Sequence, residues 1–167
     1  MASPPRQLAR KEQDVSASLL VACLVIGVAD GDSLKIKCDE RVNAMSIRLS
    51  EIDAPEIVHK SIGIREQPGG RESKASLTEL CLGQPAVVHV IRTDLYRRTL
   101  AKVECAGVQV NVEQVRRGMA LAYMPKKRSI IPGLEVKARA DGVGLWAQPD
   151  PIKPSVWRKT VLVTSTL

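Results

Sequence analysis

Alternating hydrophobic and polar residues in the first third of the chain predict a β-hairpin. Two segments, 20–29 and 33–38, have the two-residue period of half-buried strands. In the second segment, leucine, isoleucine and cysteine alternate with two lysines. The dipeptide Asp30-Gly31 between the segments is typical of a two-residue hairpin turn. We therefore expect the two strands to pair and to bury one face.

The same alternation predicts a third strand over residues 42–49. Its hydrophobic residues would face inward, which leaves Arg48 on the opposite face. The chain then enters segment 52–55, where a proline favours a loop. This segment contains Asp53 and is followed directly by Glu56. Arg48 is therefore expected just upstream of two carboxylates.

Helical periodicity predicts three helices in the rest of the chain, over 71–82, 111–117 and 132–140. The first two are each followed by a glycine, a residue that often ends helices in the left-handed conformation. Two more strands are expected over 86–91 and 98–105. The order of five strands and three short helices predicts a small β-barrel with helices, of the oligonucleotide-binding (OB) fold class.

Length and composition favour one domain. The chain has 167 residues and a mass of 18.2 kDa. We expect the domain over 19–158, an unstructured leader or cloning remnant over 1–18, and a C-terminal tail over 159–167. The core must be aliphatic, because the chain has no phenylalanine and only 2% aromatic residues. The apolar run 16–29 is too short to span a bilayer and is interpreted mainly as a strand.

The charge of the chain favours a polyanionic partner. Lysine and arginine outnumber aspartate and glutamate by 25 to 18, which gives a net charge of +7. Such a surplus promotes phosphate contacts, although many proteins this basic bind no particular partner. The basic run 126–128 allows the same two interpretations, and we favour a solvated surface over a phosphate contact.

Four cysteines, at positions 23, 38, 81 and 105, lack the close spacing of a zinc site. With a turn at Asp30-Gly31, residues whose numbers sum to 61 would lie opposite each other, so Cys23 would face Cys38. This pair would be either a cross-strand disulfide or two buried thiols. Cys81 and Cys105 are a second candidate pair.

Three segments concentrate the ionisable residues that a metal-dependent phosphodiester cleavage needs. They are D-G-D-S at 30–33, R-L-S-E-I-D-A-P-E at 48–56 and D-L-Y-R-R-T-L-A at 94–101. Asp32, Asp53 and Glu56 would bind a hard cation and activate water. Arg48 and Arg98 would each hold a phosphate through two parallel hydrogen bonds. Each segment alone is commonly a turn, a loop or a solvated charge pair, but their joint occurrence predicts a nuclease.

In this order, the three segments resemble the signatures of the staphylococcal-type thermonucleases, which are D-G-D-[ST], R-L-x-x-I-D-[AT]-P-E and D-x-Y-G-R-x-L-A. The likeness covers about residues 22–158. It implies an OB-fold barrel of five strands with three helices, and a calcium-dependent phosphodiesterase that acts on DNA and RNA. It also implies that Asp32, Asp53 and the carbonyl of Ala54 hold one Ca²⁺, with Glu56 as the general base.

The resemblance assigns roles to four further residues. Arg48 and Arg98 would contact the scissile phosphate, and Tyr96 and Tyr123 would line the nucleotide pocket. The products would carry 3′-phosphate and 5′-hydroxyl ends. His59 lies in a predicted loop and receives no role.

This sequence departs from the family pattern at four positions. Ser33 and Ala54 stand where threonine is found in the family, and Leu95 stands where a basic residue is frequent. Arg97 replaces the glycine directly before Arg98. If that position needs a positive φ, Arg97 either adopts a costly conformation or the turn is rebuilt.

The alternative function is a catalytically silent OB-fold module that binds nucleic acid or a protein partner. Retention of all five ionisable positions favours the enzyme. We expect a monomer whose substrate is nucleic acid, DNA and also RNA, without a membrane partner. We expect it to be periplasmic or secreted, with the cytoplasm as the alternative.

Overall fold

The computed structural model describes residues 23–38, 43–59 and 63–164, with side chains described as far as residue 160. The leader predicted over 1–18 and the start of the first predicted strand lie outside these residues. No helix within the described ranges is long and apolar enough to cross a membrane.

Six strands form one sheet in the order β3-β2-β1-β5-β6-β7. They are β1 (Cys23–Asp30), β2 (Ser33–Lys37), β3 (Met45–Leu49), β5 (Pro85–Thr93), β6 (Thr99–Cys105) and β7 (Val108–Gln109). Neighbouring strands are antiparallel, and β3 also pairs with β6 in parallel, which closes the sheet into a barrel. The predicted barrel class is confirmed. The strand count is larger than five because β7 and a small second sheet of β4 (Ile52–Asp53) and β8 (Leu121–Ala122) are added.

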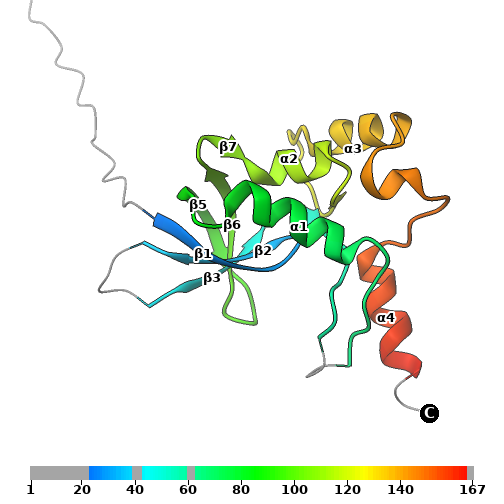
Figure 1. Ribbon diagram of the computed structural model, residues 1–167, viewed down its shortest axis with the longest axis horizontal. Helices are drawn as coiled ribbons and strands as arrows, with labels where there is room; N and C mark the ends of the chain where they lie inside the picture. Colours follow the sequence, from blue (N-terminus) through cyan, green and yellow to red (C-terminus); the bar gives the residue numbers. More distant parts are fainter. Residues whose placement is uncertain (1–22, 39–42, 60–62, 165–167) are drawn as a thin grey trace, which may run out of the picture.

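Within the residues that the structure describes, α-helices and a 3₁₀ helix accompany the barrel. They are α1 (Gly70–Cys81), α2 (Val110–Arg116), α3 (Ile131–Ala140), the 3₁₀ helix η2 (Gly144–Ala147) and α4 (Pro154–Thr164). The three predicted helices lie within two residues of their expected bounds. The sequence analysis did not predict α4, which runs across the expected end of the domain at 158. Figure 1 shows α1 across the barrel, and α4 next to the loop that precedes α1.

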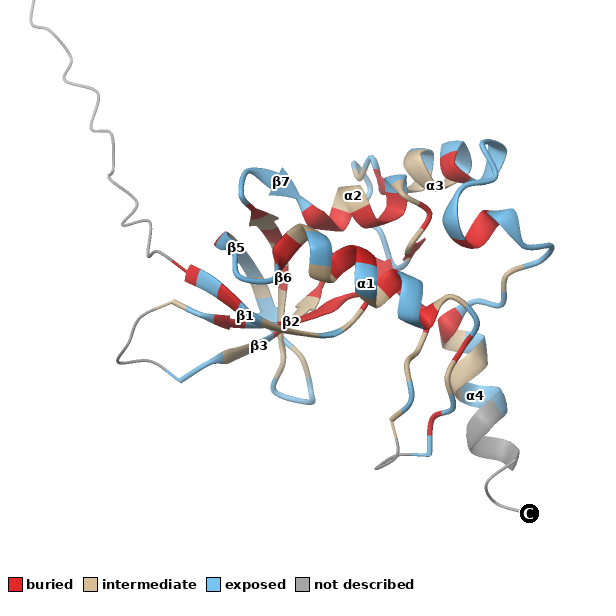
Figure 2. Ribbon diagram, viewed as in Figure 1, coloured by how far each residue is buried: buried red, intermediate tan, exposed pale blue. Residues whose placement is uncertain are grey.

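The core is aliphatic, as the composition requires. Ile36, Ile47, Leu77 and Val103 are among its almost completely buried side chains. Burying such a side chain stabilises the fold by about 1.5–3 kcal/mol. Figure 2 shows buried positions, in red, on α1, on α2 and along the strands. A smaller cluster around Trp146 packs under α3.

The turn between β1 and β2 lies one residue later than predicted. Asp30 pairs with Ser33, so the two turn residues are Gly31 and Asp32. The side chain of Asp30 accepts a hydrogen bond from the Asp32 N–H at 3.0 Å, which is the local bond of an Asx turn. This turn carries Asp32 into the interior, where the Asp32 side chain is buried.

Two register shifts along the hairpin offset this displacement. They lie between Asp30 and Val28 and between Gly27 and Val25, and they restore the expected pairing of Leu24 with Lys37. In the structure Cys23 and Cys38 form a disulfide at the far end of the hairpin.

A second disulfide joins Cys81 to Cys105. Cys81 is the last residue of α1 and Cys105 the last residue of β6, so this bond ties the helix to the barrel. Both side chains are completely buried.

Candidate active site

The turn that carries Asp32 is held in place by tight packing. A β-carbon added at Gly31 would lie 1.8 Å from Ser73 Oγ on α1 and 2.7 Å from Ala54 Cβ. Only glycine allows this approach of the turn to the helix and to the Ala54 loop. Gln114 on α2 donates a hydrogen bond of 2.7 Å to the carbonyl of Gly31. The position of Asp32 is therefore set by two helices and a loop.

Arg48 bridges two buried carboxylates. Its Nη2 donates to Asp53 Oδ1 at 2.7 Å, and its Nη1 forms an ion pair with Asp32 Oδ2. Asp32 Oδ2 also accepts the N–H of Ala54 at 2.6 Å. The first two of the three predicted segments, 30–33 and 48–56, are therefore in contact, although Asp32 and Ala54 are 22 residues apart in the sequence.

Burial and charge act against each other in this cluster. Burial raises the pKa of Asp32 well above its ordinary value, and the Arg48 guanidinium opposes that rise. Burial also disfavours the charged form of Arg48, but Asp32 and Asp53 outweigh it and raise the pKa of Arg48. Arg48 therefore remains a cation between the two carboxyl groups.

Glu51 is close to Asp53 in sequence but belongs to another part of the structure. Its carboxylate accepts the N–H of Lys126 at 3.0 Å and pairs with Lys102 at 3.2 Å. Asp53 lies in β4, which pairs with β8 through Leu121. Glu51 therefore binds the loop that follows β8, whereas Asp53 binds Arg48.

The backbone of Glu56 is fixed against the start of α1. Its N–H donates to Gln67 Oε1 at 3.3 Å, and its carbonyl accepts the Gln67 N–H at 2.9 Å. A β-carbon at Gly70 would lie 2.3 Å from the Glu56 carbonyl oxygen. The Nε2 of His59 lies 3.9 Å from Glu56 Oε2 and 4.0 Å from Asp30 Oδ2. His59, which the sequence analysis passed over, thus lies at the edge of the acidic cluster.

Arg158 on α4 is the main functional residue that the sequence analysis missed. Its Nη1 and Nη2 donate to Asp53 Oδ1 at 3.1 Å and Oδ2 at 3.0 Å, and Nη1 also bonds to Glu56 Oε1. Burial opposes its charge, but the bonds to Asp53 and Glu56 outweigh burial and raise the pKa of Arg158. No pattern around position 158 signals this contact, because it depends on how α4 packs.

Arg98 lies apart from the acidic cluster and is held by Asp94. The two oxygens of Asp94 accept the Arg98 N–H at 2.9 Å and the Arg98 Nε–H at 2.8 Å. The guanidinium lies 5.6 Å from the centre of the Tyr96 ring. Arg97 has a φ of 60°, which is the left-handed conformation. The family pattern has glycine at this position, the residue that adopts this conformation most easily. The turn is kept rather than rebuilt.

One cavity connects the two arginines. It has a volume of about 390 Å³ and is lined by Arg48 and Arg98, together with Tyr123 and Lys126. This volume is within the range of small-molecule sites. Tyr123 thus lines the same cavity as the two arginines, whereas Tyr96 does not line it and is 80% exposed. Lys126 is exposed and still borders the cavity, so the basic run is partly a cavity wall.

The donor atoms of the cluster fit a hard cation. The carboxylates of Asp32 and Asp53 both contact the Arg48 guanidinium, and Ala54 follows Asp53 in the chain. The available donors are carboxylate and carbonyl oxygens, which suit a hard cation. Within the described ranges, no three His, Cys, Asp or Glu side chains are grouped to hold an ion. Two carboxylates, a carbonyl oxygen and water would have to make up the ligand set.

Comparison with known proteins gives a consistent result. The family described as "Staphylococcal nuclease homologue" matches residues 46–148. An uncharacterized endonuclease of Haemophilus influenzae is 37% identical over 139 residues, which cover 82% of this chain and 72% of that protein. An uncharacterized endonuclease of Escherichia coli O157:H7 is 35% identical over 136 residues, covering 80% and 82%.

The match to a plant relative covers only part of the plant protein. The staphylococcal-like nuclease CAN1 of Arabidopsis thaliana is 35% identical over 114 residues, or 68% of this chain and 33% of that protein. The family match begins inside β3 and ends before α4, so Arg48, Asp53, Glu56 and Arg98 fall within it, whereas Arg158 does not. The chain therefore belongs to the staphylococcal nuclease family and is a nuclease.

Proposed function

We propose that this nuclease depends on calcium and hydrolyses phosphodiester bonds of DNA, and of RNA as well. The observation that carries the proposal is the arrangement of Asp32, Arg48, Asp53 and Glu56. Ion pairs link these four side chains, through Arg158 in the case of Glu56, and Arg48 of this cluster lines a cavity that Arg98 also lines. Paired acids beside paired arginines suit cleavage of a phosphodiester, which needs a base and positive charge.

The cation would be held by Asp32, Asp53 and the Ala54 carbonyl. When bound, it supplies positive charge to a phosphate oxygen and so lowers the cost of the charge that develops there. Glu56 accepts the proton of the attacking water, and its backbone bonds to Gln67 keep it oriented for that step. These roles follow the family likeness and the geometry of the cluster.

Arg48 and Arg98 donate hydrogen bonds to the phosphate as it becomes five-coordinate. Removing one donor of this kind commonly costs about 3–4 kcal/mol of transition-state stabilisation. Lysine would restore little, because it lacks the two parallel donors of a guanidinium. Tyr123 offers an aromatic face for a base, and Lys126 adds a charge at the cavity wall. Tyr96 contributes from outside this cavity, beside Arg98.

Plasmid DNA incubated with Ca²⁺, with Mg²⁺ or with chelator tests the proposal. The parent is compared with Glu56→Gln and with the matched control Glu72→Gln, whose exposed side chain lies on α1. We expect cleavage with Ca²⁺ that is lost with chelator and in Glu56→Gln but kept in Glu72→Gln. Cleavage that survives the chelator would refute the metal role. Binding of DNA without cleavage under any metal would favour the silent binding module.

We also propose that the protein works as a monomer in an oxidising compartment, the periplasm or the medium. The disulfides Cys23–Cys38 and Cys81–Cys105 support this, since such bonds persist where thiols are not kept reduced. Fractionation of expressing cells, with thiol alkylation before denaturation, tests it. Recovery in the cytoplasm with four alkylated cysteines would contradict the proposal.

A further inference from the structure

Arg158 occupies the atoms that the proposed function assigns to the cation and to the base. Both oxygens of Asp53 accept a hydrogen bond from its guanidinium, at 3.0 and 3.1 Å. The same group forms an ion pair with Glu56. Since Arg48 also bonds to Asp53 Oδ1, this carboxylate is fully engaged by two guanidinium groups. A cation approaching Asp53 meets a positive charge that is already bound there.

Two positive charges compete for one carboxylate in this arrangement. A divalent cation on Asp53 would be placed within a few ångströms of the Arg158 guanidinium, at a buried position where solvent screens poorly. Binding of the cation therefore favours departure of Arg158. Glu56 would lose its ion pair in the same event and become available to water.

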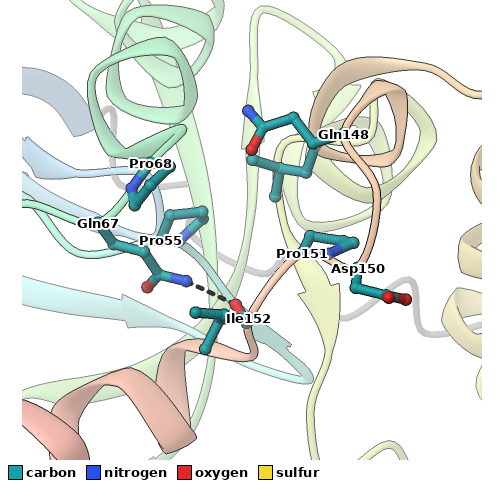
Figure 3. A pocket seen from close by; sticks show the side chains of 8 residues that line it. Pro55, Gln67, Pro68, Gln148, Asp150, Pro151 and Ile152 are labelled. Atoms are coloured by element: carbon teal, nitrogen blue, oxygen red, sulfur yellow. Dashed lines mark hydrogen bonds between the residues drawn. The ribbon is translucent and has the colours of Figure 1, made fainter.

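Two further hydrogen bonds attach α4 and the segment that leads to it. Trp157 Nε1 donates to the carbonyl of Arg65 at 3.0 Å. In the segment that leads to α4, the carbonyl of Ile152 accepts a hydrogen bond of 2.6 Å from Gln67, shown dashed in Figure 3. Pro154 is buried, whereas Val156 is half exposed. The Arg158 contacts are the ones that join the described part of the helix directly to Asp53 and Glu56.

The segment before α4 does not pack closely on the loop beneath it. Between them lies a cavity of about 130 Å³, and in Figure 3 the prolines Pro55 and Pro151 face it from opposite sides. Gln67 lines the same cavity and links Glu56 to Ile152. This space allows the segment to shift while the barrel stays intact.

We propose that α4 is a latch: Arg158 closes the site in the cation-free protein, and binding of the cation at Asp53 releases the helix. The latch rests on the proposed function, because it takes Asp53 as a ligand of the cation. Arg158 lies outside the part of the chain that matches the family, 46–148. The cation concentration that activates the enzyme is then set by the strength of the Arg158 contacts.

Calorimetric titration of the full chain with CaCl₂ tests the latch. The variants are Arg158→Gln, the control Lys159→Gln and Asp53→Asn. Lys159 is the next residue of the same helix and is exposed, so its replacement removes an equal charge without touching Asp53. We expect Arg158→Gln to bind Ca²⁺ at least tenfold more tightly than the parent. Lys159→Gln should stay within twofold of the parent, and Asp53→Asn should lose binding.

Hydrogen exchange of the α4 amides provides a second measurement that does not involve catalysis. In the parent, Ca²⁺ should raise the exchange rate of peptides covering 154–164, and in Asp53→Asn it should not. Equal Ca²⁺ affinity of the parent and Arg158→Gln, with binding still lost in Asp53→Asn, would overturn the latch and leave the metal site standing. Absence of Ca²⁺ binding from the parent and Arg158→Gln alike would overturn both proposals. Weaker DNA binding of Arg158→Gln at unchanged Ca²⁺ affinity would make Arg158 a substrate contact instead.

Discussion

Gln114 donates a hydrogen bond of 2.7 Å to the carbonyl of Gly31, 83 residues earlier in the chain. The same amide donates to the carbonyl of Ser73 at 3.1 Å and accepts the hydroxyl of Ser76 at 2.7 Å. Gln114 is completely buried, so water cannot hydrogen-bond to these polar groups and the amide of Gln114 satisfies them instead. One side chain on α2 thus fixes both α1 and the turn that carries Asp32.

Replacing Gln114 with leucine should destabilise the protein strongly. The change keeps the volume but leaves two carbonyl groups and a hydroxyl buried without their partner, at a cost of about 2–4 kcal/mol in the free energy of unfolding. Urea denaturation measures this. The control is Gln109→Leu, since Gln109 is exposed and its side-chain amide donates to the surface residue Glu104. Equal denaturation midpoints for the parent and Gln114→Leu would show that the buried amide does not support the fold.

Asp94 should act on catalysis through Arg98. It holds the Arg98 backbone and guanidinium at once, so Asp94→Ala frees the arginine to leave the cavity wall. We expect kcat to fall about tenfold with a smaller change in KM, which corresponds to about 1.4 kcal/mol. A double-mutant cycle on DNA cleavage distinguishes this from a general loss of structure.

In that cycle, Arg98→Ala alone should cost more than Asp94→Ala, and the double variant should be no slower than Arg98→Ala. Costs that simply add would mean that Asp94 supports activity by a route independent of Arg98.

Glu113 should make the stability depend on pH in the acid range. Hydrogen bonds from Arg116 lower the pKa of Glu113 from 4.5 to about 2. Arg117 lowers this pKa as well, whereas burial opposes the shift. A lowered pKa in the folded protein means that the unfolded chain binds the proton more readily. The stabilisation is therefore complete above about pH 4.5 and is lost as the pH falls towards 2.

Denaturation at pH 6, 4 and 3 tests this on the parent and Glu113→Gln. Between pH 6 and 3 the parent should lose about 1 kcal/mol more than the variant, a modest figure because Arg116 is largely exposed. Glu72→Gln, at an exposed position of α1, should follow the parent. Parallel curves for the parent and Glu113→Gln would contradict the assignment.

The part of the cluster that local order determines can be expected from the sequence. Asp53 follows β3 directly, so the strand period and the short segment after it place Asp53 beside Arg48. The turn was misplaced by one residue because the β1 strand contains two register shifts, which do not disturb the alternation of its side chains enough to be seen.

Arg158 was missed for a different reason. Its helix has no strong apolar stripe within the described side chains, and its contacts with Asp53 and Glu56 join residues 105 and 102 positions apart. Contacts of that kind depend on tertiary packing, which neither propensity nor periodicity encodes. The three segments could be joined in sequence reasoning because they share ionisable residues suited to one reaction and resemble the signatures of a known family. The acidic cluster itself also contains Asp30 and His59, which spacing alone had left as a turn residue and a loop residue.

Arg97 carries a cost in stability that glycine should remove. Its φ of 60° is unfavourable for a residue with a side chain, so Arg97→Gly should raise the free energy of unfolding by about 0.5–1 kcal/mol. Arg97→Lys, which keeps both the charge and the strain, should match the parent. The glycine variant loses a charge next to Arg98, so its DNA affinity should fall and become less salt-dependent by about one unit of slope. A glycine variant that is less stable than Arg97→Lys would mean that the Arg97 side chain stabilises the turn more than its backbone strains it.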